Sequence, residues 1–232
     1  LMLNRLEQLG HVTHFENPLG ERRKDPQRSA YARAKSVPRV DQAEWVMIID
    51  ADEFVNISVG DGTVQALIDT CDTADAISLV WQIIGSDGER RWSDAPVTER
   101  FNSAANLLEP ENGLVWGFKT LFRRQAFDYF GVHRPRWFKY RKIARGYVHW
   151  VNGSGEDTYD KLYESGWRFN SRNLGYDYGV VNHYAVKSKE EFLLKRARGT
   201  ANSSDADRIN LDYWAKYDLN AKPAIPIIVK GM

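Results

Sequence analysis

The chain has 232 residues and a nearly balanced charge, with 32 Lys and Arg against 31 Asp and Glu. A formal net charge of +1 gives no overall attraction for nucleic acid or for an anionic membrane, so any anion site must be local. Cys71 is the only cysteine, which excludes an internal disulfide framework and a thiolate zinc site. These features predict a cytoplasmic chain with no transmembrane segment and no nucleic-acid partner.

The first part of the chain alternates predicted helices and strands. Residues 1–10 carry apolar side chains at helical spacing and end in a glycine, and residues 11–15 alternate like a short strand. Residues 27–35 predict a second helix, and the apolar run from Trp45 predicts a strand that ends at Asp50. This order favours a parallel sheet covered by helices, with ligands bound at the carboxyl ends of its strands.

The second part continues with both element types. The pattern predicts a helix over residues 62–68 and a strand over residues 76–84, which a Gly-Ser-Asp-Gly turn closes. Residues 89–116 are polar and predict a long loop with some helix around residues 97–101. Further strands are expected over residues 118–123 and 180–186. The most amphipathic helix is expected over residues 189–198, with Ser188 as its N-cap and Gly199 as its stop.

Two carboxylates stand at the end of the apolar run 45–49, at Asp50 and Asp52. Side chains two apart in an extended backbone point the same way, so both carboxylates are expected to face one pocket. Mg²⁺ or Mn²⁺ prefers one or two carboxylates together with phosphate oxygens from a substrate. A surface turn after a core strand is the alternative interpretation.

Five blocks extend this pattern over nearly the whole chain and occur in a fixed order. They are Asp50-Ala51-Asp52-Glu53-Phe54, Trp81 followed by Gly85-Ser86-Asp87-Gly88, Lys119-Thr120-Leu121-Phe122-Arg123, Asn182-His183-Tyr184-Ala185-Val186-Lys187-Ser188, and Phe192-Leu193-Leu194-Lys195-Arg196-Ala197-Arg198-Gly199. Together these blocks resemble a bacterial branch of glycosyltransferase family 2.

The resemblance implies an A-type glycosyltransferase fold, which is a Rossmann-like mixed α/β sheet flanked by helices. In such enzymes the Asp-X-Asp holds the metal that bridges the diphosphate of a sugar nucleotide, and a late histidine completes the coordination. By position, Asp50, Asp52 and His183 take those roles, with Mn²⁺ or Mg²⁺ as the cofactor. The family's first strand has no counterpart before the helix over residues 1–10, so we expect a sheet that lacks its first strand.

Glycosyl transfer with inversion needs one carboxylate to take the proton of the acceptor hydroxyl, while cationic side chains stabilise the leaving diphosphate. Lys195 and Arg198 lie three apart on one helix face and are the candidates for the diphosphate, with a solvated basic face as the alternative. Asp157 or Glu156, in a loop with glycines, is the candidate base, and Asp87 is a rival. Turn chemistry is the alternative explanation for all three acids.

The sequence therefore predicts a single domain over residues 1–232, with a nucleotide and metal half over about 1–85 and an acceptor half over about 86–232. We expect a metal-dependent, inverting glycosyltransferase that moves a sugar from a nucleotide-sugar donor to a glycan or lipid-linked acceptor. A peripheral contact with a membrane stays open. The alternative is a catalytically silent glycosyltransferase-like domain that binds without turnover. An ATPase is disfavoured because no phosphate-cradling Gly-X-X-X-X-Gly-Lys precedes the acidic strand end.

Overall fold

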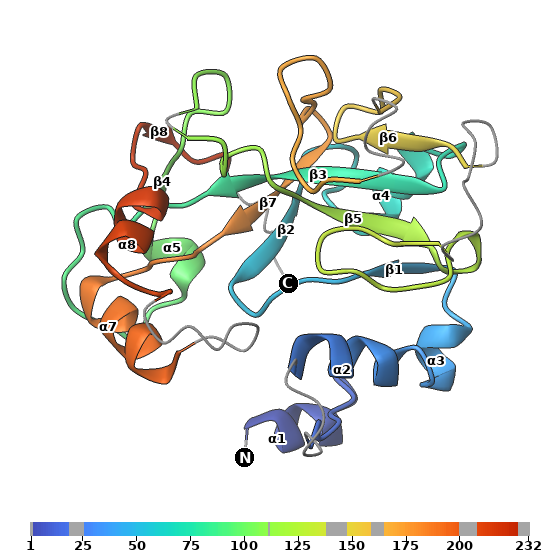
Figure 1. Cartoon of the computed structure of the whole chain (residues 1–232), viewed down its shortest axis with the longest axis horizontal. Helices are drawn as coiled ribbons and strands as arrows, with labels where there is room; N and C mark the ends of the chain where they lie inside the picture. Colours follow the sequence, from blue (N-terminus) through green and yellow to red (C-terminus); the bar gives the residue numbers. More distant parts are fainter. Residues whose placement is uncertain are drawn as a thin grey trace.

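The computed structural model shows a mixed α/β fold in which helices flank a mixed sheet (Figure 1). The structure describes residues 2–18, 26–110, 112–137, 148–158, 165–199 and 208–226. The helices are α1 (Met2–Gln8), α2 (Pro26–Ala34), α3 (Pro38–Asp41), α4 (Val64–Thr70), α5 (Val97–Arg100), the 3-10 helix η1 (Arg124–Ala126), α7 (Lys189–Arg198) and α8 (Leu211–Tyr217). The strands are β1 (Trp45–Met47), β2 (Glu53–Ile57), β3 (Ala76–Ile83), β4 (Ser103–Ala104), β5 (Phe118–Arg123), β6 (Trp150–Asn152), β7 (Gly179–His183) and β8 (Lys222–Pro223).

The main sheet has the order β1-β5-β3-β7-β2 along the described strands, and β6 also pairs with β3. The pairs β1–β5, β3–β5 and β2–β7 are antiparallel, whereas β3 runs parallel to both β6 and β7. Strands from the two predicted halves of the chain therefore alternate within one sheet. The short strands β4 and β8 form a separate pair.

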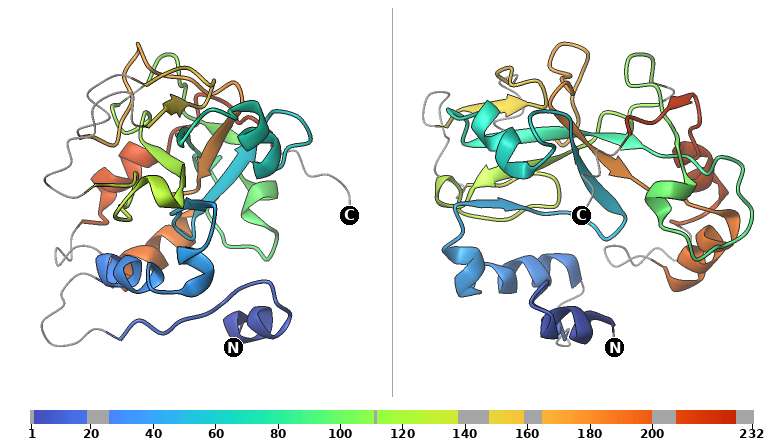
Figure 2. Two further views of the ribbon diagram at one scale, coloured as in Figure 1. Left: turned by 90° about the vertical axis from the view of Figure 1, so that its right-hand side faces the viewer. Right: turned by 180° about the vertical axis from the view of Figure 1, so that it is seen from behind.

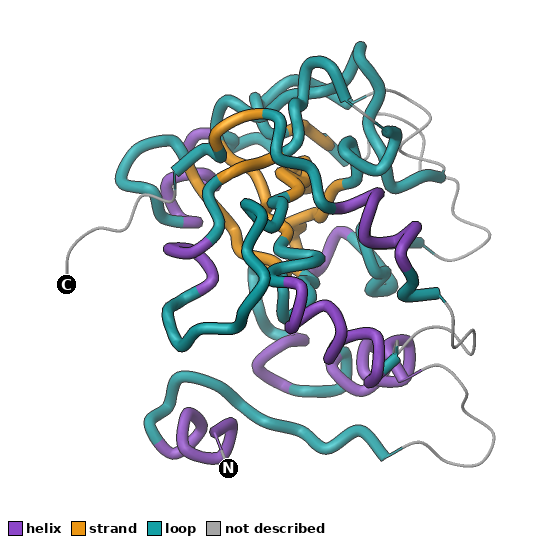
Figure 3. Tube along the Cα trace, turned by 90° about the vertical axis from the view of Figure 1, so that its left-hand side faces the viewer, coloured by secondary structure: helices purple, strands orange, loops and turns teal. Residues whose placement is uncertain are grey.

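The helices lie on several sides of the sheet. α2 and α3 lie beside β1, with α1 outermost, while α4 covers the opposite face, which the view from behind brings to the front (Figure 2). α5, α7 and α8 gather near the end where β7 stops. Figure 3 shows the strands at the centre with helical segments around them. Among the described residues, no helix is both long and apolar enough to cross a membrane.

β3 forms the centre of the core because each of its residues is buried, as its β-branched and apolar sequence favours. Its polar member Ser78 is satisfied inside the sheet. The Ser78 hydroxyl lies 2.8 Å from the Thr120 hydroxyl on β5, and the indole N–H of Trp150 donates to Ser78 over 2.8 Å. These bonds tie β5 and β6 to β3 through one buried hydroxyl.

Several predicted elements are confirmed with small shifts. β3, β5 and α7 match their expected ranges, and α4 begins after an N-cap at Thr63. Ser188 caps α7 through a reciprocal capping box with Glu191, and Gly199 ends it at a φ of 77°. The short helix α5 lies inside the expected polar loop.

Two expectations about single strands are wrong. Residues 11–15 form no strand, and Phe15 is 57% exposed, so the alternation there meets no core face that would bury it. We therefore find no sheet position beside that segment in the described structure. The strand over 180–186 ends at His183, and the chain then turns toward α7.

The mixed sheet flanked by helices that the resemblance implies is confirmed. The parallel sheet that the element order alone favours is wrong, because β5 enters between β1 and β3 in the antiparallel sense.

The packing around Gly117 gives a direct test of this core. A Cβ at Gly117 would overlap the indole of Trp81 and lie 3.0 Å from Cζ3 of Trp167. Gly117→Ala should therefore lower the free energy of unfolding by about 1–3 kcal/mol, the usual cost of overpacking. Chemical denaturation measures this loss. Gly113→Ala is the matched control, because its Cβ would meet only Arg168 at an ordinary 3.6 Å. Equal stability of the two variants would contradict the packing described here.

Candidate functional site

The two carboxylates of the Asp-X-Asp are presented by a tight turn, not by a strand. β1 ends at Met47, and residues 51–52 form a turn before β2 begins at Glu53. The backbone N–H of Glu53 donates to the Asp50 carbonyl over 3.0 Å, and the Asp50 N–H donates to the Glu53 carboxylate over 2.8 Å. The expected alternation of an extended backbone is therefore wrong here, because the turn's own hydrogen bonds set the directions of the two side chains.

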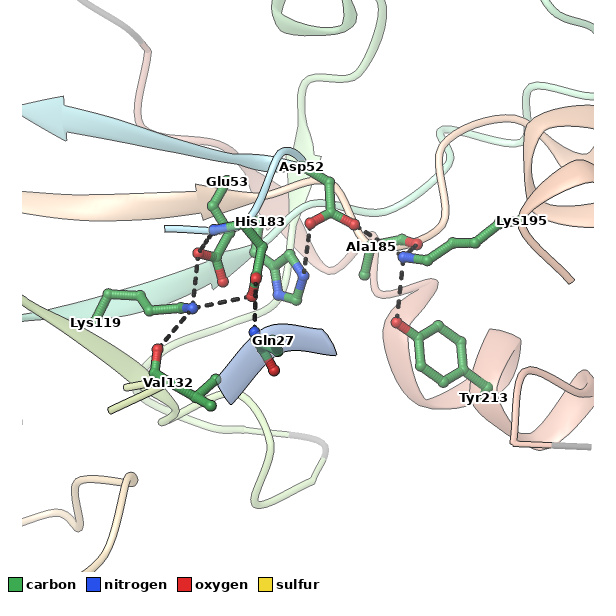
Figure 4. Close-up of polar contacts among 10 residues, drawn as sticks. Gln27, Asp52, Glu53, Lys119, Val132, His183, Ala185, Lys195 and Tyr213 are labelled. Carbon is green, nitrogen blue, oxygen red and sulfur yellow. Dashed lines mark hydrogen bonds and ion pairs between the residues drawn. The ribbon is translucent and has the colours of Figure 1, made fainter. Parts of the chain in front are cut away.

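A buried ammonium group holds one side of this turn. Lys119 lies on β5 and is fully buried. Its Nζ lies 3.0 Å from the Asp50 carboxylate and 3.1 Å from the Glu53 carboxylate, and it donates to the Val132 carbonyl over 2.9 Å (Figure 4). The amide of Gln27, on α2, donates to the other Asp50 oxygen over 3.2 Å. Two segments that are distant in sequence, α2 and β5, therefore meet at Asp50, and the loop at Val132 supports the Lys119 ammonium.

A second ammonium group holds Asp52. The Nζ of Lys195, on α7, lies 2.9 Å from the Asp52 carboxylate and 2.8 Å from the Ala185 carbonyl, with the Tyr213 hydroxyl at 3.5 Å (Figure 4). Both side chains keep some exposure, at 23% for Asp52 and 20% for Lys195. Burial raises the pKa of Asp52, but its electrostatic interactions with His183 and with the Lys195 ammonium, together with the hydrogen bond from Lys195, outweigh burial and leave the pKa below its ordinary value.

His183 is the buried group between these ion pairs. It is the last residue of β7 and stands opposite Glu53 in the β2–β7 register. Its Nε2 lies 3.9 Å from the Asp52 carboxylate, and its ring packs on Trp81 at 4.6 Å between centroids. Burial lowers the pKa of His183 to about 4, so the imidazole is neutral at physiological pH and keeps a lone pair for a ligand or a proton.

Glu53 is the second acid at the Lys119 ammonium. Burial raises its pKa to about 7, although Lys119 acts in the opposite direction and Asp50 adds to the rise. Burial is the main cause, and the neighbouring Asp50 carboxylate, which shares the same buried ammonium group, raises the pKa further. When Glu53 is protonated, the opposite charges of Lys119 and Asp50 balance each other.

Aromatic rings form one wall beside the charged groups. The His133 ring stacks on Trp167 at 4.8 Å, and Trp81 lies 5.2 Å from His133 and 5.8 Å from Trp167. Burial lowers the pKa of His133 to about 4, and Lys119 adds to that shift, so this ring is also neutral at pH 7. Flat amphipathic rings of this kind are suited to contact with a sugar or a base.

Only two of the three predicted metal ligands lie together. Among the described residues, no group of three or more His, Cys, Asp or Glu side chains is placed to hold a metal ion. Asp52 and His183 do lie together, whereas Asp50 is engaged by Lys119 and Gln27. The Nδ1 of His183 and one oxygen of Glu53 are buried without a hydrogen-bond partner. Asp52 and His183 supply only two ligand side chains, so a divalent ion between them would need further oxygens from a bound ligand.

The remaining predicted site residues lie apart from this cluster. Arg198 is exposed at the end of α7, while Lys195 of the same helix points inward. Glu156 and Asp157 lie in the turn after β6, where Asn152 donates to the Glu156 carboxylate over 3.1 Å. β6 pairs with β3 no further than Ser78, whereas His183 pairs with Ile83, about 16 Å along the strand.

Asp87 lies in the loop that follows β3, at the same end of β3 as His183. Its carboxylate accepts the Asn102 backbone N–H over 2.6 Å, and its φ is 51°. This left-handed conformation is one that Asp adopts in turns. The role of each of these three acids as a base stays a prediction.

Sequence reasoning missed several members of the cluster, although signals for them were present. Lys119 directly follows the apolar Phe118 near the start of a predicted strand, and Glu53 directly follows the Asp-X-Asp. His133 belongs to a His-Arg-Pro block after β5. No local pattern marks Gln27 or Tyr213, because only the fold brings α2 and α8 to the turn.

No protein-family model matches this chain, and no curated protein matches it significantly. The site is therefore interpreted from its own geometry.

Because the pKa of Glu53 is raised in the folded chain, we expect the stability of the fold to depend on pH. A carboxyl group with a raised pKa in the folded chain stabilises the fold below its ordinary value of 4.5 and loses that contribution as pH rises to about 7. Glu53→Gln removes the titration. The variant should therefore gain stability relative to the parent between pH 4.5 and 8, by about 1–3 kcal/mol.

Denaturant unfolding of both proteins across this pH range measures the difference, and the difference cancels the separate titrations of His133 and His183. Glu156→Gln, the same change at an exposed side chain, is the control. If the difference in unfolding free energy between the parent and Glu53→Gln stays constant with pH, the pKa of Glu53 is not raised in the folded chain.

Proposed function

We propose that this chain is a metal-dependent glycosyltransferase of the A-type fold, moving a sugar with inversion from a nucleotide-sugar donor to a glycan or lipid-linked acceptor. One observation carries the proposal. The sequence blocks that resemble glycosyltransferase family 2 contribute Asp50, Asp52, Lys119, His183 and Lys195, and these side chains meet at one place. Blocks that served only folding would have no need to gather their charged members around one turn.

The charge balance of the cluster suits a diphosphate accompanied by a divalent cation. Asp50 and Asp52 are each neutralised by a lysine, so the carboxylates alone offer little net attraction for a free cation. A diphosphate would compete with Asp52 for the partly exposed Lys195 ammonium. Its arrival would release the Asp52 carboxylate toward the cation, and binding of the two should therefore be mutually dependent.

Asp50, Asp52 and His183 would hold the metal, and Mn²⁺ or Mg²⁺ would neutralise charge that builds on the diphosphate as the bond to the sugar breaks. Lys195 would donate to a phosphate oxygen, because its ammonium is partly exposed and sits on a helix beside the carboxylate. Lys119 is fully buried and would instead fix the orientation of Asp50. The stacked rings of His133 and Trp167, which are partly exposed, would offer a surface for the sugar or the base.

For the base that takes the acceptor proton, Asp87 is the best supported of the three proposed acids. It follows the carboxyl end of β3, the end at which β7 places His183. Asp157 and Glu156 follow β6, which pairs with the other end of β3. A base must come within hydrogen-bond reach of the acceptor hydroxyl, so topology ranks Asp87 first.

A catalytically silent domain that binds a sugar nucleotide or a glycan is the second candidate. The observation in its favour is that both carboxylates of the Asp-X-Asp already have ammonium partners. Such a domain would bind nucleoside diphosphate through Lys195 without a metal and without turnover.

Release of nucleoside diphosphate from a panel of nucleotide sugars with Mn²⁺ tests the proposal. Water can replace the acceptor in such an assay, so no acceptor need be known. Asp52→Asn should lower the rate by at least about 100-fold, because it removes the negative charge that holds the cation and positions Lys195. Its thermal midpoint should change little, since the Asp52–Lys195 pair is partly exposed.

Asp69→Asn, the same change at an exposed side chain on α4 outside the cluster, is the matched control and should keep the Mn²⁺-dependent hydrolysis of donor. The proposal fails if the parent binds a nucleoside diphosphate but releases none from any donor, which is the behaviour of the silent domain. It also fails if Asp52→Asn and Asp69→Asn both hydrolyse donor at the same rate as the parent.

A further inference from the structure

The outer face of α7 carries leucines where a surface helix usually carries charge. Phe192, 2% exposed, packs on Tyr213 and Trp214 of α8, and Lys195 reaches inward to Asp52. At about 100° per residue, the opposite face is centred on Leu193, Leu194 and Ala197. Leu193 is 50% exposed and Leu194 is 68% exposed.

The chain segment beside α7 adds an aromatic ring to this face. The Glu190 N–H donates to the Arg90 carbonyl over 3.1 Å, and the Trp92 N–H donates to the Glu190 carboxylate over 2.8 Å. Trp92 is 58% exposed. Since Glu190 lies three and four positions before the two leucines on the helix, the exposed segment that carries Trp92 borders the face that carries the leucines.

Basic side chains surround these apolar groups. We call this area the α7 surface, made of Glu89, Arg90, Arg91, Trp92, Lys189, Glu190, Leu193, Leu194, Arg196, Ala197 and Arg198, all exposed. Five of these residues are basic and two are acidic, which gives a local net charge of +3. The whole chain has a net charge of only +1, so the positive charge is concentrated here.

We propose that the α7 surface docks on an anionic lipid bilayer. Exposed leucines with a tryptophan and a basic rim are the composition of helices that lie in a membrane interface. The basic residues complement anionic headgroups, while the leucines and the indole enter the boundary between headgroups and acyl chains. A second copy of the chain is disfavoured, because a symmetric contact would bring the same basic residues face to face.

Docking would bring the candidate site close to the lipid surface. Lys195 and the leucines lie on opposite sides of one helix, whose diameter is about 10 Å. The Asp52–Lys195 pair would therefore lie within about one helix diameter of the headgroups. This inference does not rest on the proposed glycosyl transfer, because it uses only the outer face of α7.

Vesicle co-sedimentation of the 232-residue chain tests the proposal. The chain should bind vesicles of phosphatidylcholine with about 30 mol% phosphatidylglycerol, and bind phosphatidylcholine alone at least about ten-fold more weakly. Added salt should weaken the binding, since the basic rim supplies the attraction. Equal binding to both vesicle types, or no binding to either, would overturn the proposal.

The apolar contribution is tested with matched variants. Leu194→Glu should weaken binding to the anionic vesicles at least about ten-fold. Leu108→Glu is the control, because Leu108 is 71% exposed on the loop before β5 and outside the α7 surface. Thermal midpoints of both variants check that each is folded. Equal effects of the two substitutions would contradict the assignment of the α7 surface.

Sedimentation velocity tests the alternative that a second copy of the chain occupies the α7 surface. The proposal predicts that the parent chain has the same oligomeric state as Leu194→Glu in the absence of lipid. A dimer that Leu194→Glu abolishes would instead assign the α7 surface to a contact between copies, and the lipid proposal would be wrong.

Discussion

The candidate site depends on one interaction, the sharing of the buried Lys119 ammonium by Asp50 and Glu53. An isolated ammonium group could not stay inside a sheet, and these two carboxylates with the Val132 carbonyl satisfy it. Because Lys119 lies on β5, its contacts join the Asp-X-Asp turn to the middle of the sheet. The turn is therefore placed by the core and not by a flexible loop, which is what a preorganised binding site requires.

The second lysine makes the same turn responsive to a ligand. Lys195 pairs with Asp52 at partial exposure, whereas Lys119 is fully enclosed. The two ion pairs therefore differ in how readily an incoming anion can exchange with them. The buried pair is costly to break, because each charge would be left without a partner in a low-dielectric interior, while the exposed pair contributes little to stability. This asymmetry assigns orientation to Lys119 and ligand contact to Lys195.

The sequence predicted those elements whose local signals agree with their packing. β3 and α7 match because a long apolar run and a capped amphipathic pattern each specify one structure. The five charged residues of the cluster lie in blocks that the resemblance had already marked. What local reasoning could not supply was their pairing. The antiparallel insertion of β5 brings Lys119 to Asp50, and α8 brings Tyr213 to Lys195, through contacts distant in sequence. Residues 11–15 alternate like a strand, yet no neighbouring strand pairs with them in the described structure. The strand predicted there from periodicity alone is therefore wrong.

Calorimetry with Mn²⁺ and a nucleoside diphosphate, each alone and then together, tests the central claim most directly. Since lysines already neutralise both carboxylates, each ligand alone should bind weakly, and each should raise the affinity for the other by the same factor, at least about ten-fold. Tight binding of Mn²⁺ to the free protein, with an affinity that the nucleotide leaves unchanged, would contradict the account. It would mean that the ammonium groups do not compete for the carboxylates of Asp50 and Asp52.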